Sequence, residues 1–304
     1  MNHSPRPILA LLTMSILWGY SWTILKMGLL DADPFTFTAL RIGTGAGALL
    51  VILPLTGRPW RPTRIPELLR LGMVQSAALF TFSTWAIYHG NAGRVAFLTY
   101  TMPFFTLLMA WPILGERVKG LQWLAIFFAA TGLVAIVQPW NLDNTPLSNA
   151  LAIAAGAAWG LGAIMVKRMQ NRAPMDLIAM TAWQMFFGLI PLIVAAVLTP
   201  NAYVEWTPRF IGVVLFIGVI STACGWLLWV YALNNLEAGT ASLGTLLAPV
   251  IAMASSAYHF GERPNGVEYL GMGAIIAALL TLSFIAIRAT TRATPQESTP
   301  LSSE

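Results

Sequence analysis

The chain has 304 residues, of which 57% are hydrophobic and only 10% are charged. Ordinary soluble domains are about 45–50% apolar and about 25% charged, so this chain has too little polar surface to cover a globule in water. A net charge of +5 would suggest nucleic acid as a partner in a soluble protein, but here the position of the charges matters more than their sum. We therefore expect an all-α integral membrane protein with lipid around it and no nucleic-acid partner.

The apolar runs predict the transmembrane segments. A hydrocarbon core about 30 Å thick needs about 20 apolar residues per helix. On this measure we predict ten transmembrane helices, over residues 8–28, 35–55, 68–89, 92–113, 121–138, 148–168, 177–198, 209–233, 239–259 and 266–287. The first run lacks a small-residue cleavage site and is too long for a typical signal peptide, so we expect it to be retained. Residues 291–304, rich in Ser, Thr and Pro, predict a disordered cytoplasmic tail.

The distribution of basic residues predicts the orientation. With the N-terminus in the cytoplasm, twelve of the 17 Lys and Arg residues fall on the cytoplasmic side. Four fall outside, Lys26, Arg94, Arg209 and Arg263, and Arg41 lies within the second span. Because cytoplasmic loops carry an excess of Lys and Arg, this bias places both termini in the cytoplasm.

An internal repeat organises the chain. Shifting residues 92–124 by 146 positions lays them without a gap on residues 238–270, with nine identities in 33 positions. Trp18-Gly19 recurs in the same way as Trp159-Gly160, 141 positions later. The repeat predicts two five-helix units, 1–140 and 145–290. Because each unit has an odd number of helices, the second enters the membrane from the opposite side, and we predict inverted repeats, a common transporter architecture.

Two prolines occupy equivalent positions of the two units. Pro103 and Pro249 lie near the middle of the predicted fourth and ninth helices, where proline leaves the carbonyl four residues earlier without its usual donor. Those carbonyls belong to Thr99 and Thr245. Free backbone groups at membrane depth are tolerated only where protein, water or ligand satisfies them. The prolines therefore indicate a hinge or a substrate cavity, or they only kink two helices whose Thr hydroxyls satisfy the backbone.

Aromatic residues are numerous inside the predicted spans. They are Trp18, Trp22, Trp85, Trp159, Trp183, Trp226 and Trp229, with Tyr88, Tyr100 and Tyr231. For any one of them, lipid contact or core packing is the default interpretation, but as a set some should line a cavity. Such a cavity would suit aromatic, amphipathic or cationic solutes.

Charged residues inside the spans are few. Arg41 either holds a carboxylate, snorkels to the interface or makes a structural pair, and its counterpart in the second unit is Gln184. No Asp or Glu falls at the centre of a predicted helix. Coupling to protons would therefore use residues at helix ends, or the protein is a facilitator; the candidates are Glu116, Glu237, Glu262, His89 and His259.

Metal and disulfide chemistry have no support in the sequence. The single cysteine, Cys224, lies within a span, where a buried inert thiol is expected. The three His are scattered, and no Cys/His cluster has zinc spacing. We expect no metal and no cofactor.

As a set, these features resemble the drug/metabolite transporter superfamily, EamA type. They are the ten spans in two inverted units, the Trp-Gly pairs and the Pro…Gly-Glu-Arg stretches that end at Arg117 and Arg263. The resemblance covers residues 8–287 and is nearest to bacterial inner-membrane exporters of aromatic amino acids. It implies a multi-pass inner-membrane protein with a central cavity lined by helices 1, 3, 4, 6, 8 and 9.

The resemblance, together with the positions of the prolines and of the Trp-Gly pairs, nominates a set of site residues. The candidates for substrate binding are Trp18, Trp22, Trp85, Thr99, Tyr100, Trp159, Trp229 and Thr245. The candidates for hinges are Gly19, Pro103, Gly160 and Pro249.

We predict an exporter of small metabolites that works by alternating access, with amino acids, aromatic ones first, as substrates. Hydrophobic cations and nucleosides are alternative substrates. A membrane enzyme or a non-transporting membrane subunit is the alternative from another class, although the sequence shows no metal cluster, buried carboxylate pair or nucleophile with a base.

Overall fold

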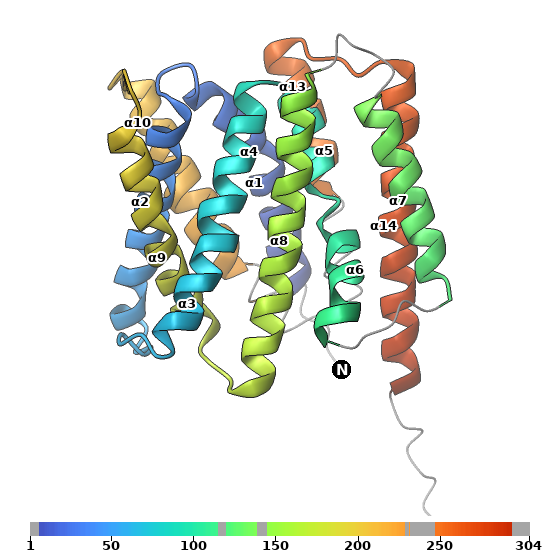
Figure 1. The fold of residues 1–304 in the computed structure, drawn as a ribbon, viewed down its shortest axis with the longest axis horizontal. Coiled ribbons are helices and arrows are strands. Elements are labelled where there is room, and N and C mark those ends of the chain that lie inside the picture. The colour runs from blue at the N-terminus through green and yellow to red at the C-terminus, as the bar shows by residue number, and fades with distance from the viewer. Residues whose placement is uncertain (1–5, 115–119, 139–144, 229–230, 232–246, 294–304) are drawn as a thin grey trace, which may run out of the picture.

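Helices account for nearly all of the described structure, a computed structural model of residues 6–114, 120–138, 145–228, 231 and 247–293. They lie side by side in one bundle (Figure 1). The named helices are α1 (Arg6–Gly28), α2 (Pro34–Leu55), α3 (Ile65–Leu71), η1 (Gly72–Ala78), α4 (Leu79–Tyr88), α5 (Ala92–Thr99), α6 (Met102–Leu114), α7 (Gln122–Val137), α8 (Pro146–Arg172), α9 (Leu177–Leu198), α10 (Pro208–Leu215), η2 (Phe216–Cys224), α13 (Leu247–Phe260) and α14 (Gly266–Ala293). Among the described residues the only β-type pairing is an isolated bridge between Ala32 and Val204. The all-α prediction is confirmed.

Four of the described helices are long and apolar enough to cross a bilayer. They are Pro34–Leu55, Pro146–Arg172, Leu177–Leu198 and Pro208–Leu228. Other predicted spans consist of several shorter segments. Residues 65–88 form one continuous helical stretch, in which the π-helical segment η1 lies between the α-helices α3 and α4. The ten spans therefore stay a prediction. At the C-terminus, α14 continues to Ala293, beyond the expected end of the last span and into the predicted tail.

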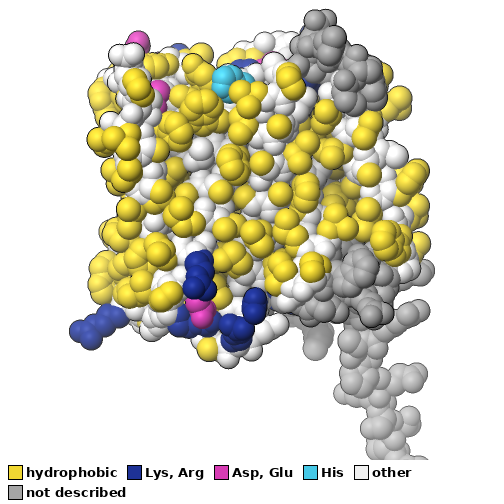
Figure 2. All heavy atoms as spheres, in the orientation of Figure 1, with side chains coloured by type: hydrophobic (Ala, Val, Ile, Leu, Met, Phe, Trp, Pro, Cys, Tyr) yellow, Lys and Arg dark blue, Asp and Glu magenta, His cyan; other side chains and the backbone are white. Residues whose placement is uncertain are grey.

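The sides of the bundle are apolar. Figure 2 shows hydrophobic side chains over most of the visible face, with Lys and Arg gathered at the end where α3 begins. Large apolar side chains such as Leu55, Val197 and Leu270 are 75–78% exposed. A surface of this kind is stable in lipid rather than in water, which fits the membrane protein expected from the composition.

Polar contacts assign the loops to two ends of the bundle. At the basic end, Arg58 pairs with Asp176, and Arg64 donates to the carbonyl of Ala173 at 2.7 Å, so the 57–64 loop meets the end of α8. At the opposite end, the loop after α1 meets the segment before α10. There the backbone N–H of Glu205 donates to the carbonyl of Asp31 at 2.7 Å.

The contacts between helices are reciprocal with respect to the two predicted units. The first helix of the first unit, α1, packs on α13, and the first helix of the second unit, α8, packs on α5 and α6. In the same way α9 packs on η1, while α2 packs on η2. Two further pairs, α2 with α9 and α7 with α14, join equivalent helices to each other. Each unit therefore completes the packing of the other.

Glycines bring helices of the two units unusually close at two corresponding contacts. A Cβ at Gly188 in α9 would lie 2.5 Å from the carbonyl oxygen of Gly72 in η1. A Cβ at Gly45 in α2 would lie 3.0 Å from the carbonyl oxygen of Gly218 in η2. These two contacts correspond across the repeat, and a side chain at Gly188 would force its helices apart. Small residues thus set the helix spacing, as is common in membrane bundles.

Matching local signals begin equivalent helices. The carboxylate of Asp33 accepts from the N–H groups of Phe35 and Thr36 at the start of α2. The carboxylate of Asp176 accepts from the N–H groups of the second and third residues of α9. Aspartate is a favoured N-cap because it satisfies donors that the helix leaves open. The repeat is therefore visible in capping chemistry that composition alone does not specify.

Pro103 lies in a different place from the one predicted. The expected helix over 92–113 is divided, since α5 ends at Thr99 and α6 begins at Met102. Pro103 is thus the second residue of α6, and Pro249 is the third residue of α13. Proline is tolerated in a first turn because the N–H it lacks would have no intrahelical partner there. The mid-helix prediction was wrong for Pro103, whereas the predicted interruption at this depth is present.

Candidate substrate cavity

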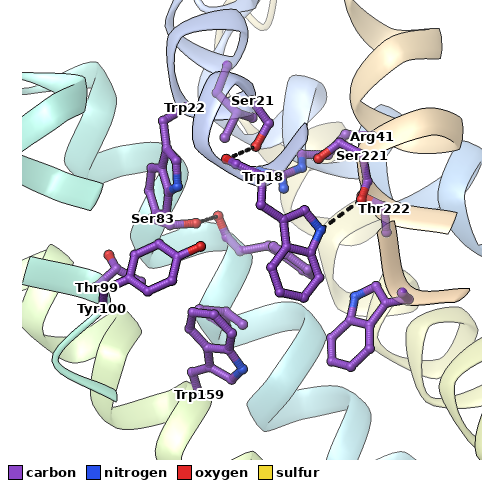
Figure 3. Close-up of a pocket in the computed structure, with 14 residues that line it drawn as sticks. Trp18, Ser21, Trp22, Arg41, Ser83, Thr99, Tyr100, Trp159, Ser221 and Thr222 are labelled. Carbon is purple, nitrogen blue, oxygen red and sulfur yellow. Dashed lines mark hydrogen bonds between the residues drawn. The ribbon is translucent and has the colours of Figure 1, made fainter. Parts of the chain in front are cut away.

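A cavity of about 90 Å³ lies among helices of both units. Because one water needs about 10–15 Å³ on this measure, the space holds several water-sized molecules. Its lining comes from α1, α2, α4 and α5 of the first unit and from α8 and η2 of the second. The lining residues are Trp18, Ser21, Trp22, Leu25, Arg41, Leu79, Phe80, Ser83, Thr99, Tyr100, Trp159, Ser221, Thr222 and Trp226 (Figure 3).

Five aromatic rings form a continuous series around this cavity. Trp18 is central, with its ring centroid 5.8 Å from that of Trp226 and 6.3 Å from that of Trp159. Trp159 in turn lies 5.6 Å from Tyr100, which lies 6.4 Å from Trp22. The contacts are edge-to-face or tilted, the arrangements that aromatic quadrupoles prefer. Such a wall can bind a planar apolar group by stacking or by edge contact.

Trp18 and Trp159 are equivalent in the two units. They are the tryptophans of the repeated Trp-Gly pairs, on α1 and α8. The structure brings their rings into contact, and Figure 3 shows both side chains beside the cavity. The Trp18 indole N–H also donates to the carbonyl of Ser221 in η2 at 3.0 Å. The two halves of the chain therefore meet at the centre of the cavity.

Hydroxyl groups supply most of the polar lining. Ser21 donates to the carbonyl of Trp18 at 2.7 Å, and Ser83 donates to the carbonyl of Phe80 at 3.1 Å. Thr222 donates to the carbonyl of Ile217 at 2.8 Å. Each hydroxyl donates to its own helix, so its oxygen can still accept a hydrogen bond from a ligand.

Arg41 is the one charged side chain among the described residues that line the cavity. It is 6% exposed, and its guanidinium carbon lies 4.7 Å from the centre of the Phe80 ring. Its Nε and Nη1 atoms are buried without a hydrogen-bond partner among the described residues. Figure 3 places the side chain near Ser221 and Thr222. Arg41 therefore neither snorkels to the interface nor makes a structural ion pair in the described part of the chain.

The structure brings five of the predicted binding residues together at this cavity: Trp18, Trp22, Thr99, Tyr100 and Trp159. Trp85 does not line it, and contacts Phe35, Tyr88 and His89 instead. Trp229 and Thr245 lie outside the described residues. The roles of all eight in binding remain predictions.

Two of the predicted hinge residues, Gly19 and Gly160, lie at contacts between the units. A Cβ at Gly19 would lie 2.7 Å from the carbonyl oxygen of Ala248 in α13. A Cβ at Gly160 would lie 3.0 Å from the backbone nitrogen of Thr106 in α6. Both glycines thus allow close helix approach. A hinge role for them, and for Pro103 and Pro249, remains a prediction.

Sequence reasoning did not single out several of the lining residues: Ser21, Ser83, Ser221, Thr222 and Trp226. Trp226 was one intramembrane tryptophan among seven, and hydroxyl residues are ordinary components of membrane helices. The π-helical segment η2 contains Ser221 and Thr222 and marks them as candidates, because π-bulges gather at functional sites. Such segments are visible only in the backbone.

An ion-pair cluster joins helices at the end of the bundle that carries the loop after α1. The Lys26 ammonium pairs with Glu262 and donates to the carbonyl of Gly90 at 3.0 Å. Glu262 also accepts from the Ser256 hydroxyl and, at 3.1 Å, from the backbone N–H of Ala92. The cluster therefore links α1 and α13 to the start of α5. Across the described ranges, no three His, Cys, Asp or Glu side chains converge as a metal site.

A cavity between helices of two repeated units, within an apolar bundle, is the arrangement of a membrane transporter. Comparison with known proteins identifies the family. The model of the EamA-like transporter family matches residues 5–138 and again residues 147–284. The chain belongs to this family and is a multi-pass membrane transporter.

Two relatives agree with this assignment, and a solved structure agrees with the fold. The chain is similar to a probable amino-acid metabolite efflux pump of Escherichia coli, at 27% identity over 90% of this chain and 92% of that protein. It is 26% identical to the uncharacterized transporter YoaV of Bacillus subtilis, over 81% and 86% of the two chains. One crystal structure matches with a TM-score of 0.63 at 17% identity, over 93% of this chain and 98% of that one, and so supports the fold alone.

Proposed function

We propose that the protein exports small metabolites from the cytoplasm, with amino acids, and among them aromatic ones, as preferred substrates. The observation that carries the proposal is the series of aromatic rings around a cavity that both units build. Stacking and edge contacts there favour a planar ring over an aliphatic side chain of equal size. The printed name of the Escherichia coli relative, a probable amino-acid metabolite efflux pump, supports the same substrate class.

The proposed transport cycle is alternating access by ten transmembrane helices in two inverted five-helix units. The reciprocal contacts between the units support it, because inverted units can exchange conformations around a central site. The Lys26–Glu262 cluster would close one end of the cavity in one of the two states. The excess of basic residues at the opposite end supports an orientation with that end, and both termini, in the cytoplasm.

Hydrophobic cations and nucleosides are the alternative substrates that an aromatic wall admits. Cations are disfavoured by Arg41, because it is the one charged side chain among the described lining residues and has the wrong sign. A nucleoside would use the rings and hydroxyls without needing Arg41.

Transport by the purified protein tests the proposal. Proteoliposomes that contain only this chain should exchange radiolabelled phenylalanine or tryptophan, and unlabelled aromatic amino acids should compete better than alanine or leucine. Trp123→Ala is a matched control, because Trp123 is 54% exposed on α7, outside the cavity lining. Exchange of nucleosides or organic cations without exchange of any amino acid would contradict the proposal.

A further inference from the structure

Arg41 occupies a position where an unpaired charge is costly. It is the eighth residue of α2, a helix of 22 residues that is long and apolar enough to cross a bilayer. At 1.5 Å per residue it lies about two turns from the helix start. Arginine at membrane depth normally pairs with a carboxylate or faces a water-filled cavity. Arg41 lines the cavity, so the second arrangement applies.

No carboxylate of the described protein reaches the Arg41 guanidinium. The nearest acidic residue along the chain, Asp33, caps the start of α2 through the N–H groups of Phe35 and Thr36. Asp176, at the start of the neighbouring α9, pairs with Arg58 at the basic end. Phe80 covers one face of the guanidinium and leaves its Nε and Nη1 donors unsatisfied among the described residues.

The equivalent position of the second unit shows what a structural role would look like. Gln184, in α9, is 2% exposed, and its side-chain oxygen accepts from the Ser76 hydroxyl at 3.1 Å. The second unit therefore fills this position with a neutral side chain whose bond is made inside the protein. Packing at this site does not require a charge, and the arginine of the first unit needs another explanation.

We propose that Arg41 binds the carboxylate of the transported solute, and that the cavity selects for carboxylate rather than for amine. This inference rests on the proposed transport of aromatic metabolites and names the group that the site recognises. A guanidinium can donate two parallel N–H···O bonds to a carboxylate, which fixes the ligand's orientation as well as its charge. The ring of the solute then lies against Trp18, Trp159 and Tyr100.

The amine of an amino acid has no acidic counter-charge in the described lining. The described lining includes no Asp or Glu. An ammonium group could contact only hydroxyl oxygens and the faces of aromatic rings there. A solute that keeps the carboxylate and lacks the amine should therefore bind at least as well as the amino acid. A solute that keeps the amine and lacks the carboxylate should bind poorly, since it would bring a second positive charge to Arg41.

Three ligands that each carry a phenyl ring distinguish recognition of the carboxylate from recognition of the amine. Binding of phenylalanine, 3-phenylpropionate and phenethylamine would be measured on the purified full chain by quenching of tryptophan fluorescence, with exchange into proteoliposomes as a second readout. We expect the first two to bind and phenethylamine to bind about 10-fold more weakly or worse. Phenethylamine binding as tightly as phenylalanine would overturn the proposal.

Two substitutions test the residue itself. Arg41→Gln copies the second unit and should weaken phenylalanine and phenylpropionate binding about 10-fold or more. Arg41→Lys keeps the positive charge but cannot make the bidentate contact, so it should weaken the binding of both ligands less than Arg41→Gln does. Arg61→Gln is the matched control, because Arg61 is exposed in the loop before α3. Unchanged affinity of Arg41→Gln for phenylalanine would refute the assignment.

Stability distinguishes ligand binding from a structural role. Removing an unpaired buried charge should leave the Tm of Arg41→Gln unchanged or higher, whereas loss of a structural pair would lower it. Competition by inorganic phosphate or chloride as strong as that by phenylpropionate would show a general anion site and contradict the carboxylate proposal. If the wild type binds phenylpropionate through Arg41 but exchanges no solute, the transport proposal fails while the Arg41 assignment stands.

Discussion

The two halves of the chain share a framework but differ in the chemistry they present to the cavity. Gly45 against Gly218 and Gly72 against Gly188 are corresponding contacts, and Trp18 and Trp159 are corresponding rings that touch. Arg41 and Gln184 correspond in the same way, yet one is an unsatisfied charge beside the cavity and the other is a satisfied amide. Duplication thus accounts for the packing and the aromatic wall, while divergence at single positions accounts for the polarity of the site.

The shared framework can be broken most severely at its glycine contacts. In Gly188→Val the new side chain would meet the backbone of Gly72 and the Cβ of Ser76, both 2.5 Å from the added Cβ, so α9 and η1 must separate. Overpacking of this kind costs about 1–3 kcal/mol or more. We expect loss of monodisperse protein, or a fall in Tm of roughly 2–12 °C, measured by intrinsic fluorescence.

Gly47→Ala is the control for that variant. No atom lies within 4 Å of a Cβ at Gly47, which is exposed on α2, and alanine favours a helix over glycine by about 0.5–1 kcal/mol. Its Tm should be unchanged or slightly higher. A Gly188→Val protein as stable as the Gly47→Ala protein would mean that α9 and η1 are not in the contact described.

The shared aromatic wall predicts similar losses from both halves. Trp18→Ala and Trp159→Ala each remove two of the ring contacts described above. In the proposed pose the solute ring also packs against each indole, and one aromatic contact contributes about 0.5–1.5 kcal/mol, so affinity for phenylpropionate should fall roughly 2- to 12-fold in each variant. A large loss for one variant and none for the other, with equal Tm, would show that the solute contacts one half only.

The ion-pair cluster joins the two halves, so its loss should lower the stability of the protein. Glu262→Gln leaves Lys26, whose side chain is 25% exposed, without its counter-charge. Because both side chains are only partly buried, we expect a cost on the order of 1–2 kcal/mol, seen as a lower Tm. The double variant Lys26→Met/Glu262→Gln should recover part of that loss. Glu67→Gln, in the more exposed pair with Arg64, should change Tm less.

The smallest effect is expected at Gln184. Gln184→Leu removes the hydrogen bond from Ser76, and a neutral hydrogen bond contributes about 0.5–1.5 kcal/mol. Tm should fall slightly while the affinity for phenylpropionate stays the same, the reverse of the pattern expected for Arg41→Gln. A fall in affinity without a change in Tm would place Gln184 in the binding site and remove the contrast between the halves.

Much of the fold could be predicted because its signals are periodic and local. Apolar runs showed the helical membrane protein, and the identities between residues 92–124 and 238–270 showed the repeat. The position of Pro103 could not be predicted, because the sequence does not show where a helix ends before a proline. That end depends on how α5 and α6 each pack against α8, where the carbonyl of Thr99 faces Gly156.

The candidate site could be predicted only in part. Five of the eight nominated binding residues line the cavity, because the repeated Trp-Gly pairs marked Trp18 and Trp159 and the position of Pro103 marked Thr99. Trp85 was an equal candidate by position along its helix, but its side chain lies among Phe35, Tyr88 and His89. Which face of a helix meets the cavity depends on the rotation of that helix in the bundle, and this depends on contacts with helices far away in sequence.

By itself, the sequence determined that this protein is helical, lies in a membrane and is built from two related units, because these properties follow from composition and repetition along the chain. Tertiary structure alone decided that Trp18, Trp159 and Arg41 share one cavity and that Nε and Nη1 of Arg41 have no hydrogen-bond partner in the described protein. The physical reason is that two side chains interact only when they lie close together in space, whatever their separation along the chain. Whether a buried guanidinium is paired within the protein or is free to bind a ligand is known only once the neighbouring carboxylates have been located.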